Sequence, residues 1–245
     1  MNRFYYDLHI HSCLSPCGDE DSTPNNIAGM AVLSELNIVA LTDHNSCKNC
    51  PAFFTAAEKY GITPIAGMEL TTSEDIHVVC LFQSLSDAMS FDSYVDQNRL
   101  HIKNRPEFFG EQLIMDGNDN VIGTEPDLLT NATNFSIDDI SDTVSRFNGV
   151  CYPAHIDRES NGIISILGAI PPNLPFLFYE MHDGDKKTEF SEKCGIEIGK
   201  IIISSDAHNL TDIRDRENYF LLDAEPTDHS TVRKILFELL RGGTK

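Results

Sequence analysis

Residues 4–11 read Phe-Tyr-Tyr-Asp-Leu-His-Ile-His, and their apolar and aromatic character predicts a β-strand that ends near Ile10. Because side chains alternate along a strand, His9 and His11 are expected on one face, with Leu8 and Ile10 on the other. Two imidazoles on one face can hold a metal ion, although two ordinary polar side chains would give the same pattern. The interpretation therefore depends on what the rest of the chain brings to this strand.

Similar short apolar runs recur along the chain, and helix signals separate many of them. Thr23 before Pro24 is typical of a helix start, and the helix predicted before Gly61 has a common left-handed stop. This order favours a parallel sheet or barrel with crossover helices. The predicted strands are Phe4 to Ile10, Ile38 to Leu41, Thr63 to Ala66, His77 to Phe82, Val150 to Pro153, Phe176 to Met181, Lys200 to Ile203 and Tyr219 to Leu222.

The composition favours one globular domain over residues 1–245. Hydrophobic residues make up 41% of the chain and aromatic residues 9%, which is enough for a sizeable core. No tandem repeat or low-complexity linker divides the sequence. We expect insertions near residues 84–135 and 157–175, and the turn-rich stretch 112–123 in the first one predicts a β-hairpin.

Acidic residues outnumber basic residues 38 to 18, so the formal net charge is −20. Such a surface disfavours long duplex nucleic acid and anionic membranes, because both require positive charge to meet phosphate groups. A small phosphorylated ligand held by bound cations stays compatible with it. With no apolar run of about 18 residues and no leader-like start, a cytoplasmic protein is expected. Nothing in the sequence indicates an oligomeric state.

The seven cysteines are an odd number and do not form the pattern of a secreted disulfide framework, so we expect reduced thiols. Cys13, Cys17, Cys47 and Cys50 lie in the loops after the first two predicted strands. A four-thiolate metal site or a redox pair is one interpretation of these residues. The simpler interpretation is that small thiols pack two long loops.

Histidines and carboxylates collect at the ends of the predicted strands, where parallel α/β folds carry their sites. Without metal, so dense a group would suffer repulsion and desolvation. Imidazole and carboxylate together suit zinc, manganese or iron, and the group exceeds the four ligands of one tetrahedral ion, so more than one ion is expected. The candidate ligands are His9, His11, His44, Glu69, His77, His155, Asp206 and His208.

The order of these motifs resembles the PHP family, named for polymerase and histidinol phosphatase. The resemblance spans nearly the whole chain and implies an α/β fold, a distorted (β/α)7 TIM-like barrel, with a trinuclear metal site at its mouth. Glu69 and His77 match the intervening ligands of the family. The four motifs are His9-Ile-His11, Thr42-Asp43-His44, Pro153-Ala154-His155 and Ser205-Asp206-Ala207-His208.

The resemblance also implies how two to three divalent ions would share the ligands. The family places an acidic ligand in the first loop, and counting back from Pro24 selects Asp19, with Glu20 and Asp21 as alternatives. One ion would take His9, His11, Glu69 and Asp206, a second would share Glu69 and add His77 and His155, and the third would use Asp19, His44 and His208.

Clustered divalent ions lower the pKa of a bridging water and neutralise charge on phosphoryl oxygens. We therefore expect a metal-dependent phosphoesterase that attacks through a metal-bridging hydroxide, with Glu69 and Asp206 as catalytic carboxylates. Its substrate would be a small phosphorylated metabolite, a nucleotide or a short oligonucleotide. Arg158 and Lys48 follow ligand motifs and are expected to bind phosphate, unless Arg158 pairs with a neighbouring carboxylate and Lys48 is a solvated charge.

Two other classes of function fit the same residues. An amidohydrolase would use a similar metal barrel to attack a carbonyl group, and a non-catalytic metal-binding or sensor module would keep the barrel without turnover. Asp7, on the strand face of His9, and Asp43, next to His44, are placed either to orient these imidazoles or to serve the structure alone.

Overall fold

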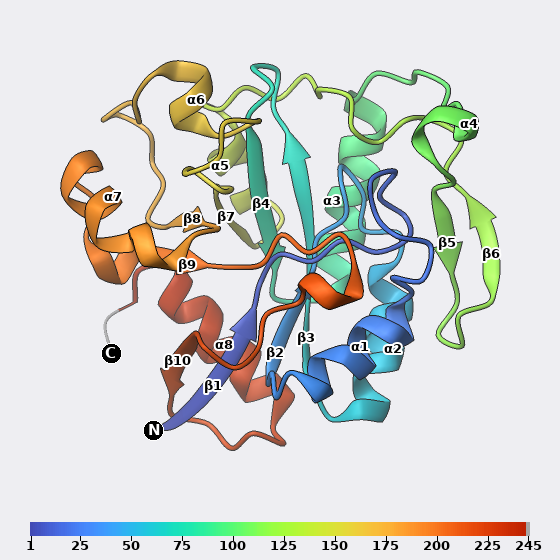
Figure 1. Cartoon of the computed structure of the whole chain (residues 1–245), viewed down its shortest axis with the longest axis horizontal. Helices are drawn as coiled ribbons and strands as arrows, with labels where there is room; N and C mark the ends of the chain where they lie inside the picture. Colours follow the sequence, from blue (N-terminus) through green and yellow to red (C-terminus); the bar gives the residue numbers. More distant parts are fainter. Residues whose placement is uncertain (244–245) are drawn as a thin grey trace.

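The computed structural model describes residues 1–243 as a curled α/β structure built around one mixed sheet (Figure 1). Its strand order is β10-β1-β2-β3-β4-β7. β8 and β9 form a separate parallel pair. The strands are β1 (Asn2–Asp7), β2 (Ile38–Leu41), β3 (Thr63–Thr71), β4 (His77–Phe82), β7 (Gly149–Pro153), β8 (Tyr179–Met181), β9 (Ile201–Ile203) and β10 (Tyr219–Leu222).

Backbone contacts complete the ring between the sheet and the β8–β9 pair. The amide of Ile156, just after β7, donates to the carbonyl of Glu180 in β8 at 2.8 Å, and Ile10, beyond β1, forms a parallel bridge with Ala207, beyond β9. Seven strands, β1, β2, β3, β4, β7, β8 and β9, therefore follow one another around the ring. The predicted distorted (β/α)7 barrel is confirmed.

The sheet is not fully parallel, which differs from the prediction. β1, β2 and β3 are parallel, whereas β4 runs antiparallel to both β3 and β7. Only residues 72–76 join β3 to β4, too few for the crossover that a parallel pair needs. As a result, the start of β4 lies beside the ends of β3 and β7, and this brings His77 to the same edge as Glu69 and His155.

Helices cover the outside of the ring, and their starts follow local sequence rules. Thr23 caps α1 by accepting a hydrogen bond from the Asn26 amide, and Gly61 ends α2 with a φ of 70°. The α-helices are α1 (Pro24–Leu33), α2 (Cys50–Tyr60), α3 (Leu85–Asn98), α4 (Pro106–Phe109), α5 (Ile140–Ser145), α6 (Ile163–Leu167), α7 (Lys187–Cys194) and α8 (His229–Leu240), and short 3-10 helices cover Gly184–Lys186, Ile198–Lys200 and Leu210–Asp212. None of the helices in the described part of the chain is long and apolar enough to span a bilayer.

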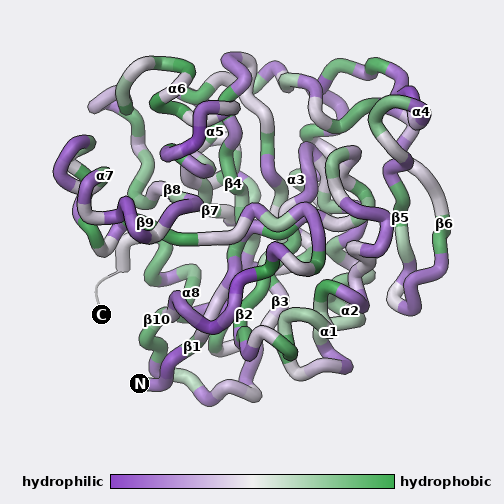
Figure 2. Tube along the Cα trace, viewed as in Figure 1, coloured by the Kyte–Doolittle hydropathy of each residue, from purple (hydrophilic) through white to green (hydrophobic). Residues whose placement is uncertain are grey.

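Hydrophobic residues, green in Figure 2, recur through the strands and the covering helices. One buried cluster fills the inside of the ring and includes Phe4, Leu8 and Tyr152, with Phe237 of α8 packed against it. A second cluster lies between the sheet and the outer helices. Because Ile65 and Glu69 are four residues apart on β3, they share its inner face, so Glu69 stands directly above the inner cluster.

The region predicted as the first insertion carries α3, α4 and the hairpin of β5 (Leu113–Met115) and β6 (Val121–Thr124). It packs against the loops that follow β1 and β2. The Met115 amide donates to Asn49, and the Asn45 side chain donates to the carbonyls of Leu129 and Asn131. This region therefore forms a wall beside the strand ends where the predicted ligands lie.

Candidate metal centre

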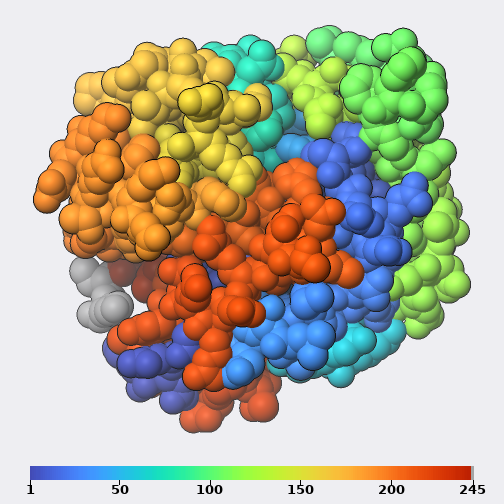
Figure 3. Space-filling model, in the orientation of Figure 1, coloured from blue at the N-terminus to red at the C-terminus, as the bar shows by residue number. Residues whose placement is uncertain are grey.

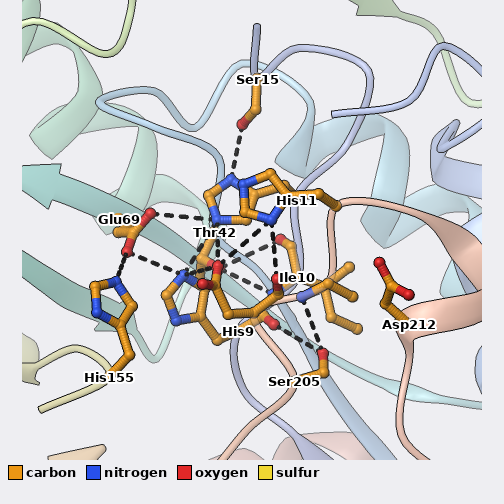
Figure 4. A network of polar contacts seen from close by, with 12 residues as sticks. His9, Ile10, His11, Ser15, Thr42, Glu69, His155, Ser205 and Asp212 are labelled. Carbon is orange, nitrogen blue, oxygen red and sulfur yellow. Dashed lines mark hydrogen bonds and ion pairs between the residues drawn. The ribbon is translucent and has the colours of Figure 1, made fainter. Parts of the chain in front are cut away.

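Imidazole and carboxylate groups from six strands meet at one end of the ring. In Figure 4, Glu69 points toward His155 and toward the pair formed by His9 and His11, with Ser15 reaching that pair from the other side. His9 and His11 follow β1, and both are buried. The other members lie on or next to β2 (His44), β3 (Glu69), β4 (His77), β7 (His155) and β9 (Asp206 and His208).

Segments from both ends of the chain meet at this centre. The Asp19 amide donates to the His208 carbonyl at 2.9 Å, and in Figure 3 the blue N-terminal loop lies against the orange-red segment near residue 210. His155 and Asp206 have φ angles of 27° and 51°, in the left-handed region that side chains other than glycine seldom adopt. Such backbone strain is concentrated at functional sites, where the surrounding structure holds it in place.

Four of these side chains form a compact group of potential ligands: His9, His11, Glu69 and Asp206. The Nε2 atoms of His9 and His11 are 3.1 Å apart, and each lies 3.2–3.3 Å from an oxygen of Glu69 and from Oδ1 of Asp206. Ligand atoms of a tetrahedral zinc ion lie about 3.4 Å from one another. The spacing of this group therefore fits one divalent ion.

Glu69 is shared with further potential ligands. Its Oε1 lies 2.8 Å from Nδ1 of His77 and 3.1 Å from Nε2 of His155, and its Oε2 lies 3.0 Å from Nδ1 of His44. Glu69 Oε2, His44 Nδ1 and Asp206 Oδ1 are buried without a hydrogen bond of acceptable geometry. Since buried polar atoms seldom stay unsatisfied, these atoms fit ligands of metal ions.

A third group consists of His11, His44 and His208. The structure does not bring the carboxylate of Asp19 into it, because Asp19 is exposed and its Oδ1 accepts a hydrogen bond from the Asp21 amide in the same loop. The alternatives Glu20 and Asp21 are exposed as well. The predicted acidic ligand of the first loop thus lies outside every metal-ligand group of the described residues.

Arg158 and Lys48, the two predicted phosphate-binding residues, lie in different surroundings. Arg158 donates to Oδ2 of Asp206 at 2.5 Å and to Nδ1 of His182 at 3.0 Å, and it lines a cavity of about 130 Å3 together with the metal-ligand groups. Lys48 instead forms an ion pair with the buried Glu125 in the wall beside the site. Arg158 is therefore the cation that faces the centre.

Sequence reasoning missed Glu180, which is fully buried below the centre. Its Oε1 lies 2.8 Å from Nδ1 of His9, so it orients the imidazole in the way that carboxylates orient metal-bound histidines. Asp7, expected as a candidate for this role, instead accepts backbone amides of His9, Ser205 and Arg214. The available signal was an acidic residue near the end of a predicted apolar strand.

Asp43 does not contact the His44 ring, but positions the surrounding loop through hydrogen bonds to serine residues. It accepts hydrogen bonds from the hydroxyl groups of Ser12 and Ser15 at 2.7 and 2.8 Å. Ser15 in turn lies 2.9 Å from Nδ1 of His11 and accepts the backbone amide of His44 at 3.1 Å. One buried carboxylate therefore holds the loop that positions two of the imidazoles.

Three of the four cysteines in the first two loops are buried and make weak hydrogen bonds to carbonyl groups, whereas Cys17 is exposed. Cys47 and Cys50 contact the Gly67 carbonyl at 3.1 and 3.6 Å, and Cys13 contacts the Leu113 carbonyl at 3.9 Å. No metal-ligand group among the described residues contains a cysteine, and all seven thiols are free. This arrangement fits the packing interpretation.

The electrostatics of the metal-free site follow from its crowded charges. Burial opposes protonation of His11 and His44. The negative charge of Glu69 favours the protonated form of both, and that of Asp206 favours protonated His11, so the pKa of each imidazole is raised to about 9. Burial and the neighbouring His11 lower the pKa of His208 to about 3. Burial favours protonation of Glu69, yet the surrounding histidines hold its pKa well below the usual value.

Metal binding is expected to release protons at neutral pH and to become tighter with rising pH. In the folded chain the imidazoles of His11 and His44 both have a pKa of about 9, above the ordinary value of about 6.5. Their protonation therefore stabilises the metal-free fold fully below about pH 6.5, and this contribution is lost as the pH rises through about 9. Metal requires the neutral imidazoles. Burial opposes protonation of His9 as well, but Glu180, Glu69 and Asp206 hold its pKa well above the usual value. Calorimetry of zinc binding in buffers of different ionisation enthalpy should therefore show about three protons released per chain at pH 7 and fewer at pH 10. Equal release at both pH values would contradict these pKa values.

The fold is a barrel-like α/β structure, and one end of it carries three overlapping groups of potential metal ligands. The model of the PHP domain family matches residues 7–160, more than half of the chain. The chain belongs to the PHP family. The family match and the cluster of buried ligands support a metal-dependent hydrolase.

Two curated proteins match part of the chain. One is an error-prone DNA polymerase of Symbiobacterium thermophilum, 33% identical over 96 residues, and the other is a 5'-3' exoribonuclease of Haemophilus influenzae, 34% identical over 79 residues. These matches cover 39% and 31% of this chain, but only 8% and 28% of the relatives. The matched regions are thus small parts of both relatives.

Solved structures share the fold over almost the whole chain. Endonuclease Q from Pyrococcus furiosus has a TM-score of 0.66 at 18% identity, and the match covers 99% of this chain and 57% of that one. A Bifidobacterium adolescentis protein described as a metal-dependent phosphoesterase has a TM-score of 0.54 at 16% identity, with 95% and 96% covered. Because both sequence identities are below 25%, the similarity establishes a shared fold and not a shared activity.

The exclusion of long duplex nucleic acid was wrong. A second structure of endonuclease Q is a complex with a 27-mer duplex whose abasic lesion lies at the active site. It has a TM-score of 0.63 at 18% identity, and the match covers 99% of this chain and 57% of that one. Net charge is a sum over the whole surface, whereas a duplex meets the local charges of one face. A value of −20 therefore does not exclude this class of ligand.

Proposed function

We propose that the chain is a metal-dependent phosphoesterase that binds two to three zinc, manganese or iron ions. The compact group of His9, His11, Glu69 and Asp206 carries this proposal, because its donor atoms have the spacing of ligands around one ion. Glu69 would be shared with a second ion through His77 and His155. The third group would use His44 and His208, with His11 next to them and Asp19 as the acidic ligand implied by the family.

When bound, the divalent ions would supply Lewis-acid charge and a water of lowered pKa. The chain's own residues have separate tasks. Glu69 and Asp206 hold the charged site together, and Glu180 fixes the orientation of His9. Arg158 would bind a phosphoryl oxygen, because its two hydrogen bonds, to Asp206 and His182, leave other donors at the cavity.

The cavity supports a substrate whose phosphate alone enters the site. Its volume is about 130 Å3, below the roughly 300 Å3 at which pockets for whole small molecules begin. The remainder of a phosphorylated metabolite, nucleotide or short oligonucleotide would lie outside, against the loops around the mouth. Glu69, Asp206 and Arg158 are therefore the residues we assign to the chemistry.

The test combines elemental analysis with product analysis. Protein purified without chelator is assayed for phosphate release from nucleotides, short oligonucleotides and sugar phosphates, with and without added manganese. Two to three ions per chain with metal-dependent release of phosphate or of phosphorylated fragments is the expected result. Cleavage of amide substrates to carboxylate and amine would instead indicate an amidohydrolase, and bound metal without any hydrolysis would indicate a non-catalytic module.

Arg158→Gln is expected to raise KM for a phosphate ester about tenfold, because a charged hydrogen bond to the phosphate is lost. Metal content should be retained, since Arg158 contacts only the oxygen of Asp206 that lies outside the compact ligand group. Lys48→Gln is the matched control, because Lys48 pairs with Glu125. Steady-state kinetics and metal analysis of both variants check the prediction, and an unchanged KM in Arg158→Gln would contradict it.

A further inference from the structure

A cavity of about 750 Å3 lies beside α8, at the end of the ring opposite to the metal centre. Gln83, just after β4, and Gly149, the first residue of β7, line it. At the other ends of the same two strands stand His77 and His155 of the metal centre. Strands of this length separate the two sites by roughly 17 Å. In Figure 1, α8 is drawn in the lower half of the view, at the height of β1, β2 and β10.

Arg233 projects from α8 to the cavity without a counterion. Its guanidinium stacks on the ring of Phe54 at 5.7 Å, and the residue is only partly exposed. Within residues 1–243 its side chain makes no hydrogen bond and no ion pair. None of its nitrogens is among the buried atoms that lack a partner, so its donors reach solvent at the cavity.

Arg241 brings a second guanidinium to the same cavity. It caps the C-terminal end of α8, eight residues after Arg233, so the two residues lie about 12 Å apart along the helix axis. Arg241 donates to Oε1 of Gln83 at 3.2 Å and to the carbonyl of Asn148 at 2.7 Å. These bonds hold it at the cavity wall and leave further donors free to meet a ligand.

The cavity wall contains one carboxylate, that of Asp87, and its hydrogen bonds come from two other residues of the same wall. Asp87 accepts the hydroxyl of Ser84 at 2.5 Å and the side-chain amide of Asn148 at 3.1 Å. In the described part of the chain, no carboxylate lies within 4.0 Å of the guanidinium of Arg233 or Arg241. The lining therefore has a net positive charge in a strongly acidic protein, and a ligand would have to supply the missing anion.

We propose that this cavity binds a phosphate-bearing small molecule of mononucleotide size, with its phosphate on Arg233. A volume of about 750 Å3 is within the range of small-molecule sites. The fork of guanidinium donors matches phosphate oxygens, and the Ser230 hydroxyl lies on the same wall. Arg241 would contact a second polar group of the ligand. This site is separate from the metal centre and does not depend on the activity proposed for that centre.

The test is calorimetry on the full chain with inorganic phosphate, pyrophosphate, AMP and ADP. Each titration is done on the metal-loaded protein and again after the metal has been removed. Binding at the metal centre should disappear with the metal, whereas binding beside α8 should persist. Arg233→Gln should weaken the persistent binding at least tenfold, and Arg241→Gln should weaken it severalfold.

Arg216→Gln is the matched control, because Arg216 also stacks on an aromatic ring, that of Tyr5 at 5.2 Å, but pairs with Glu35. Its binding should equal that of the unmodified chain. Arg233→Lys keeps the positive charge but lacks the paired guanidinium donors, so its affinity should lie between those of the unmodified chain and Arg233→Gln. A variant that had merely lost its fold would not bind with this intermediate affinity. Absence of binding by all four probes at millimolar concentration, or equal binding by Arg233→Gln, would overturn the proposal.

Discussion

Glu69→Gln is expected to remove most of the bound metal and to lower activity by about three orders of magnitude or more. Both carboxylate oxygens lie among imidazoles, with His77 at 2.8 Å from one and His44 at 3.0 Å from the other. Glutamine has the same shape, but it lacks the charge and offers only one acceptor oxygen. Elemental analysis and turnover of a phosphate ester are the measurements.

Glu74→Gln is the matched control for this variant. Glu74 follows β3 by a few residues, and its carboxylate accepts the Ile137 amide in a neighbouring loop, outside the metal-ligand groups. Metal content and turnover of this control should stay as in the unmodified chain. A Glu69→Gln protein with full metal content and unchanged turnover would mean that Glu69 has been misassigned.

Glu180→Ala is expected to lower metal affinity about 10- to 100-fold, because an orienting carboxylate behind a ligating imidazole has effects of this size. Glu180 Oε1 lies 2.8 Å from Nδ1 of His9 and 3.3 Å from the amide of His155. Without this carboxylate, the His9 ring can rotate, and the proton is no longer held on Nδ1. Competition with a zinc chelator of known affinity measures the change.

Glu180→Gln separates the hydrogen bond from the charge. Its amide oxygen can still accept from Nδ1 of His9, so affinity should fall less than in Glu180→Ala. Both variants should keep the circular dichroism of the unmodified chain. Metal affinity in Glu180→Ala equal to that of the unmodified chain would show that His9 does not need this carboxylate.

The barrel could be predicted because its signals are local. Apolar runs located the strands, and His9 and His11 meet on one side as expected. The predicted alternation does not extend this far, because β1 ends at Asp7 and Leu8 and Ile10 pack in different core clusters. The direction of β4 was missed, because the strand predicted at Thr63 to Ala66 continues to Thr71 in the structure and the link before β4 shrinks from residues 67–76 to residues 72–76. Even the longer predicted link was shorter than the dozen or more residues that a parallel crossover needs.

The surroundings of the site were less predictable because they depend on contacts between distant segments. His9 and Glu180 are 171 positions apart, and Lys48 and Glu125 are 77 positions apart, so neither pair has a spacing that could reveal it. The place of Asp19 was inferred by counting along a loop. Loop conformation is set by hydrogen bonds such as the one from the Asp21 amide, and a count of residues does not contain them.

The position of Asp206 and His208 late in the chain has a consequence for biogenesis. His9 and His11 leave the ribosome first, yet the compact ligand group lacks a member until the segment after β9 has joined β1 through Ile10 and Ala207. The compact group can therefore form only after the segment that follows β9 has been made and has folded against β1. A chain truncated before Asp206 would lack one of the four members of this group.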